Sequence, residues 1–363
     1  MKEKPPVHYI SYLKIDELLS LQKPLSFQTS HPCHDEMLFI ITHQVYELWF
    51  KQILFEVDRL LNIFRQPKIS ETNMGTIVSS LRRITEIQKV LIQQINILET
   101  MTPLDFLDFR NLIFPASGFQ SFQFRVLENK LGLKESMRLS YNDKPYHAHF
   151  SEEKAKELQK LEQELSLFEG VDHWLARTPF LQIEDFNFWE LYKHAVRDLF
   201  NQEKETLLSH PHLSEDDKTR NLKIIENNFS SFEALFDENK YQELRKKGVW
   251  RLSYKAVHAA LLIQLYREQP VFQMPFQIIT ELLNMDELMT QWRYRHALLA
   301  RRMLGTKMGT GGSSGSAYLQ ASAEQHKLFN DLFQLTTFFI PKTKLPPLPK
   351  NIEKQMGFSS LKS

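Results

Sequence analysis

Two histidines of the chain stand in surroundings that suit a cofactor site. His43 lies among apolar and aromatic residues, and Phe39 and Glu47 share its face if the segment is helical. His296 ends the run Trp292-Arg293-Tyr294-Arg295-His296. A neutral imidazole that projects from a helix is the usual protein ligand of haem iron. His296 is therefore a candidate haem ligand whose surroundings alone are a weak signal, and His43 alone fits either a cavity wall or an ordinary core or surface histidine.

Several arginines near aromatic residues have two interpretations each. Arg110 follows Phe106 and Phe109, and a guanidinium among aromatic rings suits bidentate capture of a carboxylate. The neighbouring Asp108 equally allows an ordinary Arg–Asp surface pair. Four further arginines either pair with haem propionates or form a solvated basic face; they are Arg293, Arg295, Arg301 and Arg302.

Glycine is concentrated in one short stretch. The chain has 11 glycines, and Gly305, Gly309, Gly311, Gly312 and Gly315 fall within eleven residues that are also rich in hydroxyls. The stretch lacks the Gly-Lys-Ser/Thr ending of a phosphate-binding P-loop, and it lacks the third glycine of the dinucleotide fingerprint. Two interpretations remain open, a flexible linker between helices or a loop wrapped over a ligand.

Composition and charge exclude several functional classes. Lys and Arg number 45 and Asp and Glu 44, so the net charge of +1 favours neither nucleic acid nor an anionic membrane as partner. The single cysteine, Cys33, excludes an intramolecular disulfide, a multi-thiolate metal site and a covalent haem attachment motif. No apolar stretch of signal-peptide type follows Met1, and the longest apolar runs are too short to span a bilayer. We therefore expect a cytoplasmic protein.

Apolar residues recur at helical spacing along most of the chain, and no segment alternates as a strand would. We expect an all-α fold, a helical bundle that forms one domain over residues 1–363. The charged segment 152–247 is a candidate for a covering helical sub-bundle. The expected helices are 36–64 with Asp35 as N-cap, 76–98, 152–168, 216–236 after a polar break at Pro211 and His212, 254–266, and 275–303 opened by Pro275.

Three long motifs, taken together, resemble one known family. The first runs from His34 to Trp49, and the second runs from Pro115 to Lys130 and contains Pro-Ala-Ser-Gly-Phe-Gln-Ser-Phe-Gln-Phe-Arg. The third joins the segment 292–296 to the glycine-rich stretch 309–315. With the N-terminal segment Tyr9 to Leu13, these blocks resemble the tryptophan 2,3-dioxygenases in type and order, from about residue 8 to residue 345. Three motifs in family order form a highly specific resemblance.

The resemblance implies a role for each matching residue. His296 would be the axial ligand of haem b iron, with one haem per subunit that is ferrous when active, and His43 would accept a hydrogen bond from the indole N–H. Arg110 would hold the carboxylate of L-tryptophan, and Thr310 its ammonium group. Further matching positions are Phe39 and Phe106 at the indole pocket, Ser117, Gly309 and Gly311 at the haem, and Tyr9, Tyr12 and Leu13, which a neighbouring subunit of a homotetramer inserts into the site.

The resemblance also implies the reaction, in which O₂ opens the indole C2–C3 bond of L-tryptophan to give N-formylkynurenine. Two positions depart from the family pattern, since some members have Tyr at Phe106 and many have Gly at Ile10. Two rival functions remain open, a related haem enzyme acting on another aromatic substrate and a haem carrier or gas sensor without catalysis. Arg110 and Thr310 favour the amino acid substrate, because a carrier needs no clamp for a zwitterion.

Overall fold

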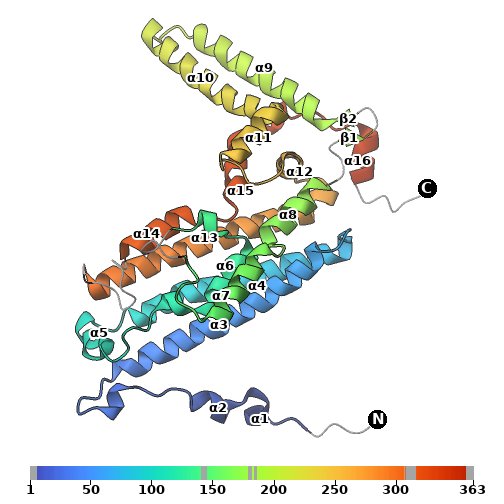
Figure 1. Cartoon of the computed structure of the whole chain (residues 1–363). Helices are drawn as coiled ribbons and strands as arrows, with labels where there is room; N and C mark the ends of the chain where they lie inside the picture. The colour runs from blue at the N-terminus through green and yellow to red at the C-terminus, as the bar shows by residue number, and fades with distance from the viewer. Residues whose placement is uncertain are drawn as a thin grey trace. The chain divides into compact units, whose positions relative to one another are not determined.

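The computed structural model describes residues 6–139, 145–178, 182–183, 186–305, 307 and 316–356, and it confirms the all-α fold (Figure 1). The only extended pairing in these residues is between β1 (Gln182–Ile183) and β2 (Phe186–Asn187), which are antiparallel. The helices are α1 (Tyr9–Leu13), α2 (Ile15–Leu19), α3 (Asp35–Phe64), α4 (Glu71–Leu98), α5 (Pro103–Arg110), α6 (Phe122–Leu131), α7 (Glu152–Gln163), α8 (Leu167–Ala176), α9 (Phe188–Leu208), α10 (Glu215–Phe236), α11 (Glu238–Lys246), α12 (Tyr254–Leu265), α13 (Pro270–Leu304), α14 (Ser316–Gln325), α15 (Asn330–Gln334) and α16 (Lys350–Met356). Short 3₁₀ turns are η1 (Ser26–Gln28), η2 (Gly118–Gln120), η3 (Glu135–Met137), η4 (Leu335–Phe338) and η5 (Lys342–Lys344).

The chain divides into two compact units, with boundaries inside the long helices α3, α4 and α13, between α7 and α8, and between α14 and α15. Unit 1 consists of residues 1–56, 84–164 and 287–327, and unit 2 consists of residues 57–83, 165–286 and 328–363. Of the helices that the structure describes, none is both long enough and apolar enough to cross a bilayer.

In unit 1, buried polar groups and aromatic rings join α3 to its neighbours. The Tyr46 hydroxyl donates to the Leu91 carbonyl at 2.9 Å, and Gln94 Nε2 donates to the Thr42 carbonyl at 2.8 Å, so α3 and α4 are tied by side chain to backbone bonds. The Trp292 ring of α13 lies 6.1 Å from Tyr46, between centroids. These contacts hold the parts of α3, α4 and α13 that carry the candidate site.

Unit 2 has its own apolar core, in which α12 packs against α8. Every residue from Ala256 to Gln264 is buried, because α12 is apolar on all sides and is enclosed. The loop before α12 is held by the buried Asp331 carboxylate, which accepts hydrogen bonds from the backbone N–H groups of Arg251 at 2.7 Å and Leu252 at 2.6 Å. Asp286 accepts the N–H groups of Leu328 and Phe329 in the same way. Buried backbone donors of two loops are thereby satisfied.

Three of the differences from the predicted helix boundaries have a local physical cause. The predicted helix 152–168 is broken, because the Ser166 side chain accepts from the Glu169 N–H while the Glu169 carboxylate accepts from the Ser166 N–H, a capping box that starts α8 afresh. Asp35 is the first residue of α3 and not its N-cap, so its carboxylate lies in the first turn, where the helix dipole favours it. Pro275 lies inside α13, which begins at Pro270, because a proline so near the N-terminus removes a single backbone hydrogen bond.

Two glycines inside helices of unit 2 give a matched test of its packing. A Cβ at Gly170 of α8 would lie 2.8 Å from Phe64 Cβ, whereas a Cβ at Gly75 of α4 would meet only Met274 Cε, at 3.7 Å. We expect Gly170→Ala to lower the free energy of unfolding by about 1–3 kcal/mol through overpacking. Gly75→Ala should raise it by about 0.5–1 kcal/mol, since alanine is the better helix former. Urea unfolding of both variants checks this, and equal stability of the two would contradict the packing described.

Candidate active site

A cavity of about 670 Å³ lies within unit 1, a volume in the range of small-molecule and cofactor sites. Most of the surface of its wall is apolar. The lining residues come from α3, the end of α4, α5 and the loop after it, α6, α13 and α14; they include Phe39, His43, Glu47, Phe50, Leu98, Met101, Phe106, Ser117, Phe119, Phe124, Arg125, Glu128, Trp292, Arg293, His296, Leu299, Met303, Tyr318, Ser322 and His326.

His296 lines this cavity from α13, beside the ring of Trp292, whose centroid is 5.4 Å away. Burial, with a smaller contribution from the nearby His43, lowers the pKa of His296 to about 4, so the imidazole is neutral at pH 7. Among the described residues, none forms a hydrogen bond with either of its ring nitrogens. A neutral, unpartnered imidazole in an apolar cavity is the donor that a haem iron requires.

His43 lines the same cavity from α3, and a backbone carbonyl of that helix determines the tautomer of its ring. Its Nδ1 lies 2.7 Å from the carbonyl oxygen of Phe39, one turn earlier. Because a carbonyl can only accept, Nδ1 carries the hydrogen, and Nε2 of the neutral ring is an acceptor. The ring is open to the cavity, yet the surrounding protein lowers the pKa of His43 by desolvation, against the weaker opposing effects of the Phe39 carbonyl and the Glu47 charge. His43 therefore presents a hydrogen-bond acceptor to the cavity.

An aromatic wall stands beside His43. The Phe39 ring centroid is 4.1 Å from that of His43, 5.9 Å from that of Phe106 and 5.5 Å from that of Phe109. Phe106 and Phe109 are buried together with Met101. Phe39 and Phe106 line the cavity, so a flat apolar ring of a ligand would meet flat apolar surfaces there.

Ser117 reaches the cavity from a loop that is tied to α3. Its side chain and that of Gln120 form a capping box around η2. Just beyond the turn, the Ser121 hydroxyl donates to Glu47 Oε1 at 2.5 Å and Gln123 Nε2 donates to Glu47 Oε2 at 2.8 Å. Glu47, on the helix of His43, thus anchors the loop that carries Ser117.

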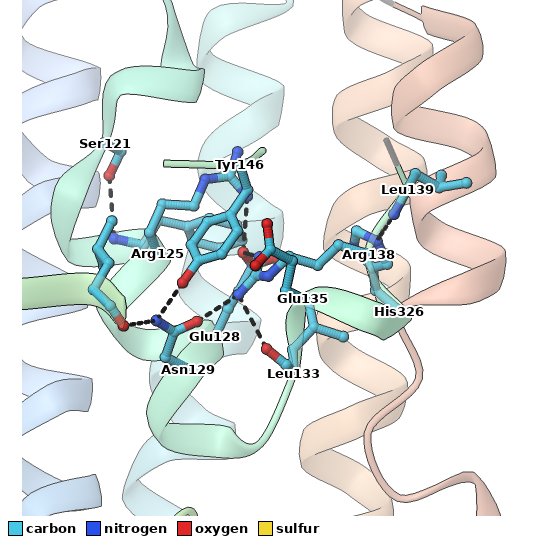
Figure 2. A network of polar contacts seen from close by, with 12 residues as sticks. Ser121, Arg125, Glu128, Asn129, Leu133, Glu135, Arg138, Leu139, Tyr146 and His326 are labelled. Atoms are coloured by element: carbon cyan, nitrogen blue, oxygen red, sulfur yellow. Dashed lines mark hydrogen bonds and ion pairs between the residues drawn. The ribbon is translucent and has the colours of Figure 1, made fainter. Parts of the chain in front are cut away.

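Glu128 of α6, which was not predicted from the sequence, is almost completely buried at the polar end of the cavity (Figure 2). Its Oε2 accepts from Arg125 Nη1 at 2.8 Å and from Arg138 Nη1 at 2.5 Å, and its Oε1 accepts from Arg293 Nη2 at 2.9 Å. Burial alone would raise the pKa of Glu128, but the charges of the three arginines hold it well below its usual range. The available signal was the spacing of Arg125 and Glu128, three residues apart on one helix.

The structure separates the four arginines near His296. Arg293 is buried and donates hydrogen bonds to Glu128 and to the His326 carbonyl. The interpretation of Arg293 as part of a solvated basic face is therefore wrong. Arg295 pairs with Glu99 at 3.0 Å, whereas Arg301 and Arg302 are exposed.

The remaining predicted residues lie apart from the lining set or beyond the described part of the chain. Arg110 is the half-buried last residue of α5 and is not among the residues that line the cavity. Tyr9, Tyr12 and Leu13 lie exposed on α1, a helix without a buried residue. Gly309, Thr310 and Gly311 fall outside the described residues.

Comparison with known proteins agrees with the motifs along the chain. A family model described as tryptophan 2,3-dioxygenase matches residues 2–339. The chain belongs to the tryptophan 2,3-dioxygenase family. Curated relatives that are named tryptophan 2,3-dioxygenase include a protein of Bdellovibrio bacteriovorus, 53% identical over 98% of this chain and 99% of the relative. Others are a Dictyostelium discoideum protein, 48% identical over 97% of this chain and 88% of the relative, and a Mus musculus protein, 44% identical over 95% and 85%.

Glu128 offers a test of what holds the polar end of the cavity together. Glu128→Gln removes the carboxylate that three arginines share, and we expect the free energy of unfolding at pH 7 to fall by about 3–5 kcal/mol. Because the folded-state pKa of Glu128 is depressed, its contribution is present above the unfolded value of about 4.3 and is lost as the pH falls. Urea unfolding between pH 7 and pH 3 should therefore show the wild type keeping its advantage over the variant down to about pH 4 and losing part of it below that pH.

The matched control is Glu226→Gln, which removes a surface partner of Lys204 whose side chain is 60% exposed. Its unfolding free energy should change by less than about 0.5 kcal/mol. A Glu128 variant as stable as this control would show that the buried cluster contributes nothing.

Proposed function

We propose that this chain is a haem-dependent dioxygenase that uses O₂ to cleave the indole C2–C3 bond of L-tryptophan, with N-formylkynurenine as product. The observation that carries the proposal is the placement of two neutral histidines, His296 on α13 and His43 on α3, in one apolar cavity. The family of the chain and the names of its relatives support the same reaction.

Haem b, one per chain, is the cofactor in this proposal. The cavity suits it in volume and in apolar lining, and the unpartnered neutral imidazole of His296 suits its iron. Ser117 lines the cavity, and Gly309 and Gly311 are assigned beside it from the family motif alone. When bound in the ferrous state, haem supplies the activation of O₂, while the protein supplies orientation and a dry pocket.

The substrate is held at three polar points and along one apolar face. Arg110 binds the carboxylate and Thr310 the ammonium group in this proposal, both assigned from the family motif. The aromatic wall of Phe39 and Phe106 encloses the indole ring. His43 accepts the indole N–H through Nε2, the nitrogen that its bond to the Phe39 carbonyl leaves unprotonated. An analogue that lacks one of these groups leaves a buried partner unpaired and is rejected.

His43 acts in this scheme by orienting the ring. Indole can react through its π-system, so the N–H proton does not have to leave first. The depressed pKa of His43 and its carbonyl-bound Nδ1 both suit a neutral acceptor. A hydrogen bond of this kind contributes about 0.5–1.5 kcal/mol, whereas general-base catalysis typically contributes about 10²–10⁴-fold in rate.

The proposal includes a homotetramer in the cytoplasm, in which the N-terminal segment of one subunit completes the site of its neighbour. Tyr9, Tyr12 and Leu13 are 70%, 73% and 42% exposed on α1, an unusual exposure for apolar side chains so close together. A neighbouring subunit that covers them would remove this apolar surface from water. The single cysteine, which is a free thiol, suits a reducing compartment.

The decisive test is product formation by the haem-loaded, reduced protein. With L-tryptophan and O₂ we expect the absorbance of N-formylkynurenine to appear, and we expect none from His296→Ala, which should fold yet bind haem weakly. Circular dichroism of the variant checks its fold, and the Soret spectrum checks its haem. A His296→Ala protein with the wild-type Soret band would overturn the ligand assignment, and a haem-loaded wild type without product would overturn the reaction.

The role of His43 can be tested with 1-methyltryptophan, whose methyl group would meet the imidazole. We expect His43→Ala to relieve this clash, so the methylated substrate should gain relative to L-tryptophan. The measurement is the ratio of kcat/KM for the two substrates in both proteins. An unchanged ratio would place His43 away from the indole nitrogen, and loss of at least about 10³-fold with both substrates would favour a general base.

A further inference from the structure

Arg125 of α6 is a buried cation with hydrogen-bond donors left over. It is 7% exposed, and it lines the cavity (Figure 2 shows its contacts). Its Nη1 donates to Glu128 Oε2 at 2.8 Å, and among the described residues this is the only hydrogen bond of its guanidinium. Its Nε is buried without an acceptor. A guanidinium carries five N–H donors, so most of those of Arg125 are unsatisfied by the protein.

The other two arginines of the cluster are used differently. Arg138 donates to Glu128, to Asn129 Oδ1 at 2.7 Å and to the Leu133 carbonyl at 3.2 Å, and it does not line the cavity. Arg293 donates to Glu128 Oε1 at 2.9 Å and to the His326 carbonyl at 2.9 Å. Arg125 therefore borders the cavity and has guanidinium N–H donors that no described residue accepts.

Charge points in the same direction. Three arginines share the single Glu128 carboxylate, and His326 adds no charge to the cluster, because burial and the neighbouring arginines lower its pKa to about 4 and leave it neutral. Glu162 lies on the Arg138 side of the cluster, where it accepts from the Tyr146 hydroxyl at 3.4 Å, and Arg138 stacks on the Tyr146 ring at 4.0 Å. The Arg125 side has no second carboxylate among the described contacts. A buried excess of positive charge is costly unless an anion accompanies it.

We propose that Arg125 is a carboxylate-binding residue of the cavity and receives an acid group of the molecule that fills it. The planar guanidinium matches a carboxylate with two parallel N–H···O bonds. The rings of Phe119 and Phe124, each 5.8 Å from the Arg125 Cζ atom, provide apolar surface next to that charge. The site thus suits an apolar body with a carboxylate at its edge.

This inference rests on the proposed function, which brings two sources of carboxylate to the cavity, the propionates of haem and the carboxylate of L-tryptophan. The two can be told apart with haem and its dimethyl ester, in which both propionates are masked. Binding of each to the apoprotein is measured by competition with apomyoglobin, for the wild type, Arg125→Gln and Arg138→Gln. Arg138→Gln is the matched control, because it also removes one arginine from Glu128 but does not border the cavity.

If the source is haem, the wild type and Arg138→Gln should prefer haem over its ester, and Arg125→Gln should reduce that preference about 10- to 100-fold. If the source is the substrate, Arg125→Gln should keep the preference. In that case it should lose about 10- to 100-fold of the wild-type preference for L-tryptophan over tryptamine, measured by spectroscopic titration of the haem-loaded proteins. Arg125→Lys, which keeps the charge without the fork, should fall between wild type and Arg125→Gln in whichever assay responds.

Either outcome supports the proposal, and two outcomes overturn it. One is that Arg125→Gln changes neither preference, and the other is that Arg138→Gln reproduces its effect, which would assign the loss to a weakened cluster. Circular dichroism and thermal melts of all variants confirm that folded proteins are compared, and Arg125→Lys takes the place of Arg125→Gln if the latter does not fold. A wild type that binds no haem would instead refute the proposed function, so the two failures are distinguishable.

Discussion

The Glu128 carboxylate accepts hydrogen bonds from arginines of three separate segments, α6, the stretch after η3, and α13. A carboxylate this deeply buried is stable as an anion only because the three guanidiniums offset the loss of hydration. In turn, the carboxylate offsets the cost of burying the positive charge of each arginine. The cluster therefore ties these segments to one another at the polar end of the cavity.

This constraint reaches the candidate cofactor ligand directly. Arg293 and His296 are three residues apart on α13, so they lie on neighbouring positions of one helix face. Fixing the Arg293 side chain on Glu128 and on the His326 carbonyl limits the rotation and sliding of that part of α13. The position of His296 on α13 is thus restrained by an ion pair that does not touch it.

A second constraint acts through low polarity. The cavity lowers the pKa of both His43 and His296, because a charged imidazole there would lose its hydration. On α3 the helical backbone also fixes the tautomer of His43, because the Phe39 carbonyl accepts a hydrogen bond from Nδ1–H. Two histidines in one cavity are thereby made neutral, and each keeps a nitrogen lone pair for a ligand.

Much of the fold follows from local spacing. The apolar pattern predicted α3, α4, α10 and α12 to within a few residues, because each of these helices buries a face or is enclosed. Helix ends were less predictable. Ser166 restarts the chain as α8 through its capping box with Glu169, and the side chains of α7 continue the same helical spacing up to that point.

The sequence by itself determined the family, the helical class and the residues whose motifs are local, such as His43 with Phe39 one turn before it, or His296 beside Trp292. For Arg293 it left two interpretations open, a partner of haem propionates or part of a solvated basic face, and it did not indicate a role for Glu128. Those two residues are 165 positions apart, and an ion pair at that separation exists only after the helices have packed. Only the tertiary structure decides which arginine is neutralised by a carboxylate and which retains donors for a ligand, because burial and partnership are properties of the packed interior.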